Sequence, residues 1–130
     1  MIVIDASMAL EVLLQTPAAA SIEERLFRTG ESLHAPHLID LEIAQVLRRY
    51  VSTRQITSTR GNEALEDWTS FTVHRYAHEP LITRIWELRN NVTAYDAAYL
   101  ALAEALQAPV VTRDSRLAGA SGHRAMIELL

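Results

Sequence analysis

The sequence contains no cysteine in its 130 residues. This absence excludes disulfides and thiolate metal sites, and it makes a reducing cytosol the natural setting, so we expect a cytoplasmic protein. No segment approaches the run of about eighteen uncharged apolar residues that a membrane span requires. The N-terminus lacks a basic segment and carries Asp5 in its first apolar run, which makes it a poor signal peptide. We therefore expect no membrane association.

Lysine is also absent, because every one of the 12 basic residues is an arginine, and the net charge is −4. This charge argues against a protein that coats nucleic acid by electrostatics alone. A coding bias explains the missing lysine more simply than selection does. The consequence holds in either case: each cation is a planar fork suited to phosphate or carboxylate.

The composition is that of an ordinary globular chain, with 49% hydrophobic and 22% charged residues. The length suits one domain over residues 1–130, and no repeat, low-complexity tract or linker interrupts it.

Apolar runs and helical periodicities alternate along the chain. The predicted strands are residues 1–5, 32–36, 71–74, 108–114 and 124–130, and the predicted helices are residues 6–15, 18–30, 37–53, 56–71, 80–91 and 93–106. This alternation predicts an α/β fold with a mostly parallel central sheet flanked by helices in α/β/α layers.

Two predicted strands end in an aspartate, namely Asp5 after MIVI and Asp114 after VVTR. In open α/β sheets the active crevice lies at the carboxyl ends of the strands. Either aspartate could instead cap the helix that follows it. Two acids at one edge of one sheet favour the functional interpretation.

The predicted helix over residues 37–53 carries two acids, Asp40 and Glu42, near opposite borders of its apolar stripe. The expected stripe consists of Ile39, Ile43, Val46, Leu47 and Tyr50. Either acid could have no further role than to lie near the helix N-terminus, where the helix dipole stabilises a negative charge. Periodicity alone does not decide which of the two faces a site.

Asp96 lies in the segment TAYDAAYLALAEAL, where Thr93 is typical of a helix N-cap. A carboxylate in the first turn can stabilise the helix through its interaction with the positive end of the helix dipole, and it then needs no further role. Asp96 nevertheless shares a helix face with Tyr99, Leu100 and Ala103, and a charge at the edge of a core needs a partner.

Converging carboxylates repel one another, and a divalent cation resolves that conflict. With no cysteine and no His-x-x-x-His pattern among the five histidines, oxygen ligation favours Mg²⁺, or Mn²⁺ in its place, over zinc. Such a site activates water for attack on a phosphodiester.

Four segments together carry a resemblance to a known family. The segments IVIDAS, LIDLEIAQVL, TAYDAAYLALAEALQAPVVTRDSRLA and MIELL resemble the PIN-domain nucleases, most closely the VapC-type toxins of type II toxin–antitoxin pairs. The most specific part runs from Asp96 to Leu117. The resemblance implies a single PIN domain that acts as a Mg²⁺-dependent endoribonuclease on RNA.

The resemblance also implies roles for individual residues. It assigns the acidic metal site, and with it catalysis, to Asp5, Glu42, Asp96 and Asp114, and so selects Glu42 over Asp40. Ser7 and Thr112 match positions that support such carboxylates. The implied partners are RNA, a small antitoxin of the VapB type over the active site, and a second copy of the chain in a homodimer.

Two residues depart from the family pattern. Gln45 stands where many relatives carry asparagine, and Arg116 stands where some carry a further acid, which weakens the case for a second protein-ligated metal. A catalytically silent PIN-fold RNA-binding module is the main alternative, but all four acids are present. An aspartate-based phosphatase generally needs an acid where Ser7 stands, and a receiver-type phosphoacceptor needs a lysine.

The aromatic residues allow further expectations. Tyr95 could stack on a base near the metal, whereas Tyr99 is expected to pack between helices. Trp68 and Trp86 lie in predicted helices and are expected to fill a core or an interface.

Overall fold

The structure is a computed structural model that describes residues 1–130. Its centre is a five-stranded sheet in the order β3-β2-β1-β4-β5, in which every neighbouring pair is parallel. The strands are β1 (Ile2–Ile4), β2 (Leu33–Pro36), β3 (Val73–Tyr76), β4 (Val110–Thr112) and β5 (Ile127–Leu129). The predicted α/β fold is confirmed, and the sheet is wholly parallel.

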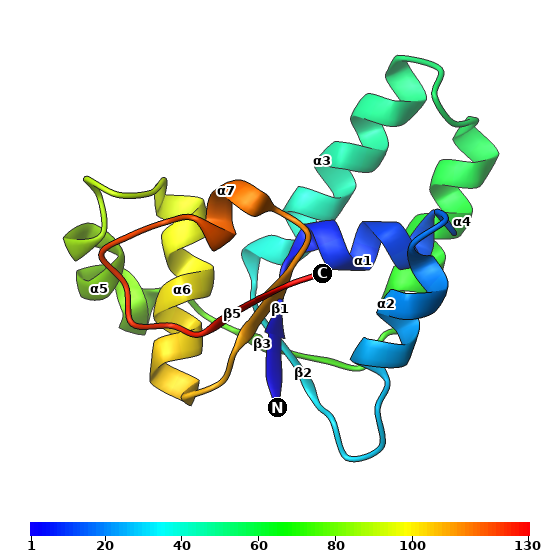
Figure 1. Cartoon of the computed structure of the whole chain (residues 1–130). Coiled ribbons are helices and arrows are strands. Elements are labelled where there is room, and N and C mark those ends of the chain that lie inside the picture. The colour runs from blue at the N-terminus through cyan, green and yellow to red at the C-terminus, as the bar shows by residue number, and fades with distance from the viewer.

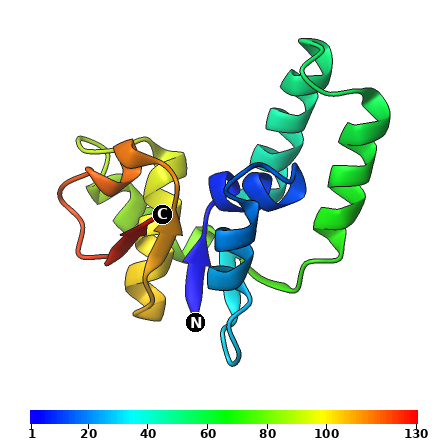
Figure 2. The same cartoon turned by 45° about the vertical axis from the view of Figure 1, so that its right-hand side comes forward.

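Helices connect the strands and cover both faces of the sheet (Figure 1). They are α1 (Ala6–Leu13), α2 (Ala19–Leu26), α3 (Leu38–Ser52), α4 (Ser58–Thr69), the 3₁₀ turn η1 (Glu79–Leu81), α5 (Ile82–Glu87), α6 (Ala94–Leu106) and α7 (Ser115–Ala118). Helices α3 and α4 form a hairpin that extends beyond the sheet, as both views show (Figures 1 and 2). None of the helices combines the length and the apolar character needed to cross a bilayer.

The core lies between the central strands and α6. Every residue of β1 is at most 1% exposed, which agrees with a parallel strand covered on both faces. Helix α6 packs against β1, β2 and β4 and buries all seven residues from Ala97 to Ala103. Four of those seven are alanines, and the small side chains let the helix lie close to the sheet.

The N-terminus of α6 has the predicted cap. The side chain of Thr93 accepts a hydrogen bond from the backbone N–H of Asp96, at 3.2 Å, so Asp96 occupies the third helical position.

Several predicted boundaries differ from the structure, and one short helix was not predicted. Helix α2 ends at Leu26 rather than Gly30, which lies in the following turn with a φ of +82° that glycine adopts readily. Strand β3 starts at Val73, two residues later than predicted. Helix α7 was not predicted, because its four residues are too few to show a periodicity.

Candidate active site

A cleft of about 360 Å³ opens where β1 and β4 run into α1 and α7. Its walls come from α1, α3, α6 and α7, which converge at the carboxyl end of the sheet (Figure 1). The four carboxylates predicted from the sequence all line it, each from a different element: Asp5 after β1, Glu42 on α3, Asp96 in the first turn of α6 and Asp114 after β4.

Asp5 is the most deeply placed of the four, with only 7% of its surface exposed. Its Oδ1 accepts hydrogen bonds from the Ser7 hydroxyl at 2.6 Å and from the backbone N–H of Met8 at 3.2 Å, while its Oδ2 accepts one from the Thr112 hydroxyl. Burial raises the pKa of Asp5, and these hydrogen bonds offset only part of that effect. Asp5 also caps α1, so the cap and the cleft share one carboxylate.

Ser7 and Thr112 join the ends of two neighbouring strands. The Ser7 Oγ accepts a hydrogen bond from the backbone N–H of Arg113 at 3.0 Å, and the Thr112 Oγ1 accepts one from the backbone N–H of Asp114 at 2.9 Å. Thr112 is fully buried. The two hydroxyls thus hold Asp5 and the backbone before Asp114 in a fixed relation, a connection that the sequence does not reveal.

Glu42 projects from α3 into the cleft and is half-buried. The Tyr99 hydroxyl donates a hydrogen bond to its Oε1 at 3.1 Å. Burial, together with the negative charges of Asp5 and Asp96, raises the pKa of Glu42 to about 7 despite this hydrogen bond. Tyr99 is itself 1% exposed, so it packs in the interior as predicted and also orients Glu42, a role that the sequence reasoning missed.

Asp40 lies on another side of α3 and does not line the cleft. Arg75 donates three hydrogen bonds to it, at 2.8, 2.9 and 3.1 Å, and the Trp68 indole donates a fourth at 2.7 Å. Burial alone would raise the pKa of Asp40, but the bonds from Arg75 and Trp68 outweigh it and hold that pKa below its usual value. The choice that periodicity left open is thus resolved geometrically: Glu42 faces the cleft and Asp40 is an ion-pair partner.

Asp96 and Asp114 lie together but have opposite electrostatic environments. Burial and then the charge of Asp114 raise the pKa of Asp96. Burial also acts to raise the pKa of Asp114, but hydrogen bonds from the Arg116 side chain, at 3.0 Å, and its backbone N–H, at 2.8 Å, lower it overall. Asp114 is therefore the one carboxylate of the four that holds an arginine.

The donor set fits a hard divalent cation. No ion pair reaches Asp5, Glu42 or Asp96, and mutual repulsion contributes to the raised pKa of each. A cation bound among these oxygens would relieve that repulsion. No three acidic or histidine side chains, as they stand, are gathered closely enough to hold an ion. The side chains thus line the cleft without forming a closed cage.

Comparison with known proteins agrees with this architecture. The family model for the PIN domain matches residues 2–122. Ribonuclease VapC12 of Mycobacterium tuberculosis is 42% identical over 130 residues, covering 100% of this chain and 99% of that protein. Ribonuclease VapC9 of the same organism is 47% identical over 117 residues, covering 90% and 88%. The crystal structure of VapBC2 from Rickettsia felis, bound to a DNA fragment from their promoter, gives a TM-score of 0.71 at 12% identity, covering 99% of this chain and 98% of that chain.

The chain thus combines a wholly parallel sheet, with acids after its central strands, and a match to the PIN-domain family model over nearly its whole length. The full-length relatives narrow this class further. The chain belongs to the PIN-domain family and, within it, to the VapC ribonucleases. The resemblance drawn from the sequence is confirmed.

Proposed function

We propose that this VapC-type ribonuclease is a toxin that hydrolyses RNA phosphodiester bonds with a Mg²⁺ ion, which Mn²⁺ can replace, held by Asp5, Glu42, Asp96 and Asp114. The observation that carries the proposal is the meeting of these four carboxylates, from four separate elements, in one cleft. Three of them have raised pKa values and no ion pair, so a bound cation would offset the cost of their negative charges.

Each residue of the cleft has a task that its contacts support. Ser7 and Thr112 fix both oxygens of Asp5, and Tyr99 fixes one oxygen of Glu42, so these two carboxylates are oriented before anything binds. A divalent ion held there would lower the pKa of a water molecule and would stabilise the charge that develops on phosphorus. Binding should be weak without RNA, because such a site leaves ligand positions for substrate phosphate.

The ends of the cleaved RNA distinguish hydrolysis by water from cleavage by the RNA's own 2′-hydroxyl. Attack by water breaks the bond from phosphorus to the 3′ oxygen and leaves a 3′-hydroxyl and a 5′-phosphate. Attack by the RNA's own 2′-hydroxyl leaves a 2′,3′-cyclic phosphate instead. We expect the purified chain to give 5′-phosphate ends with Mg²⁺ or Mn²⁺ and no cleavage in excess EDTA. Cyclic phosphate ends, or full activity in the chelator, would refute the proposal.

The same assay addresses the alternative functions. A catalytically silent RNA-binding module would bind RNA and cut nothing with any metal. An aspartate phosphatase would act on phosphate monoesters, but its second acid is replaced by Ser7, whose hydroxyl is already committed to Asp5 and to the Arg113 backbone. The contacts of Ser7 thus favour the nuclease.

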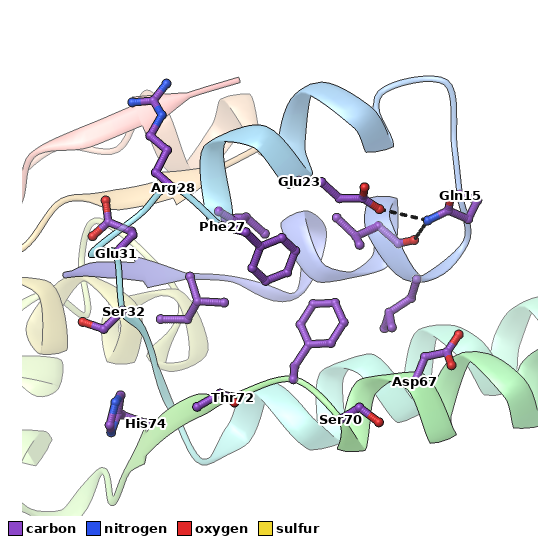
Figure 3. Close-up of a pocket in the computed structure, with 15 residues that line it drawn as sticks. Gln15, Glu23, Phe27, Arg28, Glu31, Ser32, Asp67, Ser70, Thr72 and His74 are labelled. Carbon is purple, nitrogen blue, oxygen red and sulfur yellow. Dashed lines mark hydrogen bonds between the residues drawn. The ribbon is translucent and has the colours of Figure 1, made fainter.

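We further propose that a small VapB-type antitoxin inhibits the protein by covering this cleft. Helix α1 separates the cleft from a larger groove of about 710 Å³ between α1, α2 and the end of α4 (Figure 3). Six apolar side chains line the groove: Val12, Leu13, Leu26, Phe27, Leu33 and Phe71. An apolar antitoxin segment in this groove would place the adjoining residues over α1 and into the cleft.

An arginine is the side chain that best complements the cleft, because its fork can bind two carboxylate oxygens at once. We expect an antitoxin arginine to approach Asp5, Asp96 or Asp114 and to compete with Mg²⁺. The test compares inhibition by the antitoxin and by its arginine-to-alanine form across a Mg²⁺ titration. Equal inhibition by both forms at every Mg²⁺ concentration would exclude this contact.

A further inference from the structure

A second hollow, of about 640 Å³, adjoins the acidic cleft and shares Asp96 and Arg116 with it. One wall is the connection from α5 to α6, residues 89–93, and the other is the segment after α7, residues 119–121. The hollow therefore begins where the cleft ends, at the N-terminus of α6. We call it the α6 hollow.

The walls of the α6 hollow are tied together. The Asn91 side chain donates a hydrogen bond to the Ser121 hydroxyl at 3.1 Å. Gly122 has a φ of +84°, and a Cβ there would lie 2.7 Å from the Asn91 side chain. Glycine suits this position because of its φ and because a Cβ would displace the Asn91 side chain that bonds to Ser121.

The charge of the α6 hollow is opposite to that of the cleft. Five acids and two arginines line the cleft, whereas two arginines, Arg89 and Arg116, and a single acid, Asp96, line the hollow. Its other polar side chains are uncharged amides and hydroxyls, which suit the sugar and base edges of a nucleotide. An anionic chain leaving the cleft would meet cations here.

Both arginines can reach a ligand. Arg116 has 85% of its side chain exposed, and an exposed ion pair such as its contact with Asp114 is weak enough to exchange for a phosphate. Arg89 makes no ion pair within 4 Å. Its guanidinium lies 4.8 Å from the centre of the Trp86 ring, and its Nη1 donates to the Trp86 carbonyl at 2.9 Å. Trp86 is 67% exposed, so the pair presents a stacking surface beside the hollow.

We propose that the α6 hollow binds the single-stranded RNA next to the scissile phosphate, with Arg116 and Arg89 on its phosphates and the Trp86–Arg89 pair stacked on a base. The proposal rests on the ribonuclease function proposed above and adds to it the path of the substrate. Arginine planes and exposed aromatic rings are the surfaces on which unpaired bases stack. Trp86 does not fill the core, since it is 67% exposed, and the proposal assigns it to the RNA site.

The test measures RNA binding rather than cleavage. A fluorescein-labelled single-stranded RNA is titrated with Glu42→Gln protein in Mg²⁺, over a series of salt concentrations. This variant is used because it lacks a proposed metal ligand and should not cut the RNA during the titration. Arg89→Gln is added to this background and compared with Arg54→Gln. Arg54 is exposed in the turn between α3 and α4, at the far tip of the hairpin, and its loss changes the net charge equally (Figure 1).

We expect Arg89→Gln to lower the salt slope of log K by about 0.7, the value for one phosphate contact on a single strand, and to weaken binding about fourfold at roughly 0.15 M salt. Arg54→Gln should change neither quantity. Equal binding by the two variants, or no measurable binding by either, would overturn the proposal. If the wild-type protein cleaves no RNA but the binding results are as expected, only the proposed nuclease function would be overturned.

Tryptophan fluorescence gives a second reading of the same surface. Trp68 is 2% exposed, so a neutral quencher such as acrylamide reaches only Trp86. At an RNA concentration near the Kd of the Glu42→Gln protein, RNA should reduce the quenching in that protein and in its Arg54→Gln derivative, and should reduce it clearly less in its Arg89→Gln derivative. If quenching decreases as the protein concentration is raised in the absence of RNA, a second copy of the chain covers Trp86. The proposal would then be wrong.

Discussion

Replacing Glu42 by glutamine should stabilise the metal-free protein while weakening its response to Mg²⁺. The carboxylate is held half-buried beside Asp5 and Asp96, so its negative charge opposes folding when no cation is present. Glutamine keeps the shape of the side chain and can still accept the hydrogen bond from Tyr99. The substitution therefore removes the charge and little else.

The pH dependence of this effect has a defined sign. Below pH 4.5 the carboxyl is protonated in both states, and its charge costs nothing. As the pH rises toward 7, the unfolded chain releases the proton first, so the wild-type free energy of unfolding falls. The difference between 4.5 and about 7 corresponds to at most about 3.4 kcal/mol. Water screens a half-exposed group, so we expect about 1 kcal/mol.

Thermal unfolding in EDTA at several pH values measures this effect. Glu42→Gln should match the wild type near pH 4.5 and exceed its Tm by about 3–5 °C above pH 7. Added Mg²⁺ should then raise the Tm of the wild type more than that of the variant, because the variant has lost a ligand. Asp40→Asn is the control on the same helix: it removes the negative charge that pairs with Arg75 and one of the two acceptor oxygens, and it should lower the Tm at pH 7. A Glu42→Gln protein less stable than the wild type at pH 8 in EDTA would refute the reasoning.

Two further substitutions test single contacts of the site. Asp96→Asn keeps the hydrogen bond from its backbone to Thr93 and a side chain accepted in first turns, so circular dichroism should show an intact fold while RNA cleavage and growth toxicity disappear; retained activity would mean that Asp96 only supports the helix. Thr112→Val removes the hydroxyl between Asp5 and the Asp114 backbone, and denaturant titration should show a loss of about 1–3 kcal/mol together with reduced cleavage. An unchanged midpoint of unfolding for Thr112→Val would show that the hydroxyl is dispensable.

The central elements could be predicted from the sequence because their burial produces recognisable local patterns of apolar residues. β1 and β4 are buried on both faces, so they appear as unbroken apolar runs, and α6 begins at a recognisable N-cap. Strand β3 lies at the edge of the sheet and contains the polar residues His74 and Arg75, so its pattern is weak. Its predicted position was accordingly wrong by two residues.

The choice between Asp40 and Glu42 could not be made from periodicity, because both border the same apolar stripe. What separates them is contact with residues distant in sequence. Arg75 on β3 and Trp68 on α4 hold Asp40, while Tyr99 on α6 holds Glu42. The family resemblance could select Glu42 over Asp40 because it does not depend on the periodicity of this one helix.

Arg116 shows how a short element can position a cation without leaving a pattern in the sequence. Asp114 ends the segment after β4, caps α7 and accepts hydrogen bonds from both the backbone and the side chain of Arg116. A single helical turn thus places a cation on the boundary between the acidic cleft and the α6 hollow. If Asp114 is a Mg²⁺ ligand, as proposed above, binding of the ion would free the Arg116 guanidinium from Asp114 and let it bind an RNA phosphate. Under this proposal Arg116, which stands where some PIN-domain relatives carry an acid, would bind a phosphate at a position where those relatives could bind a metal.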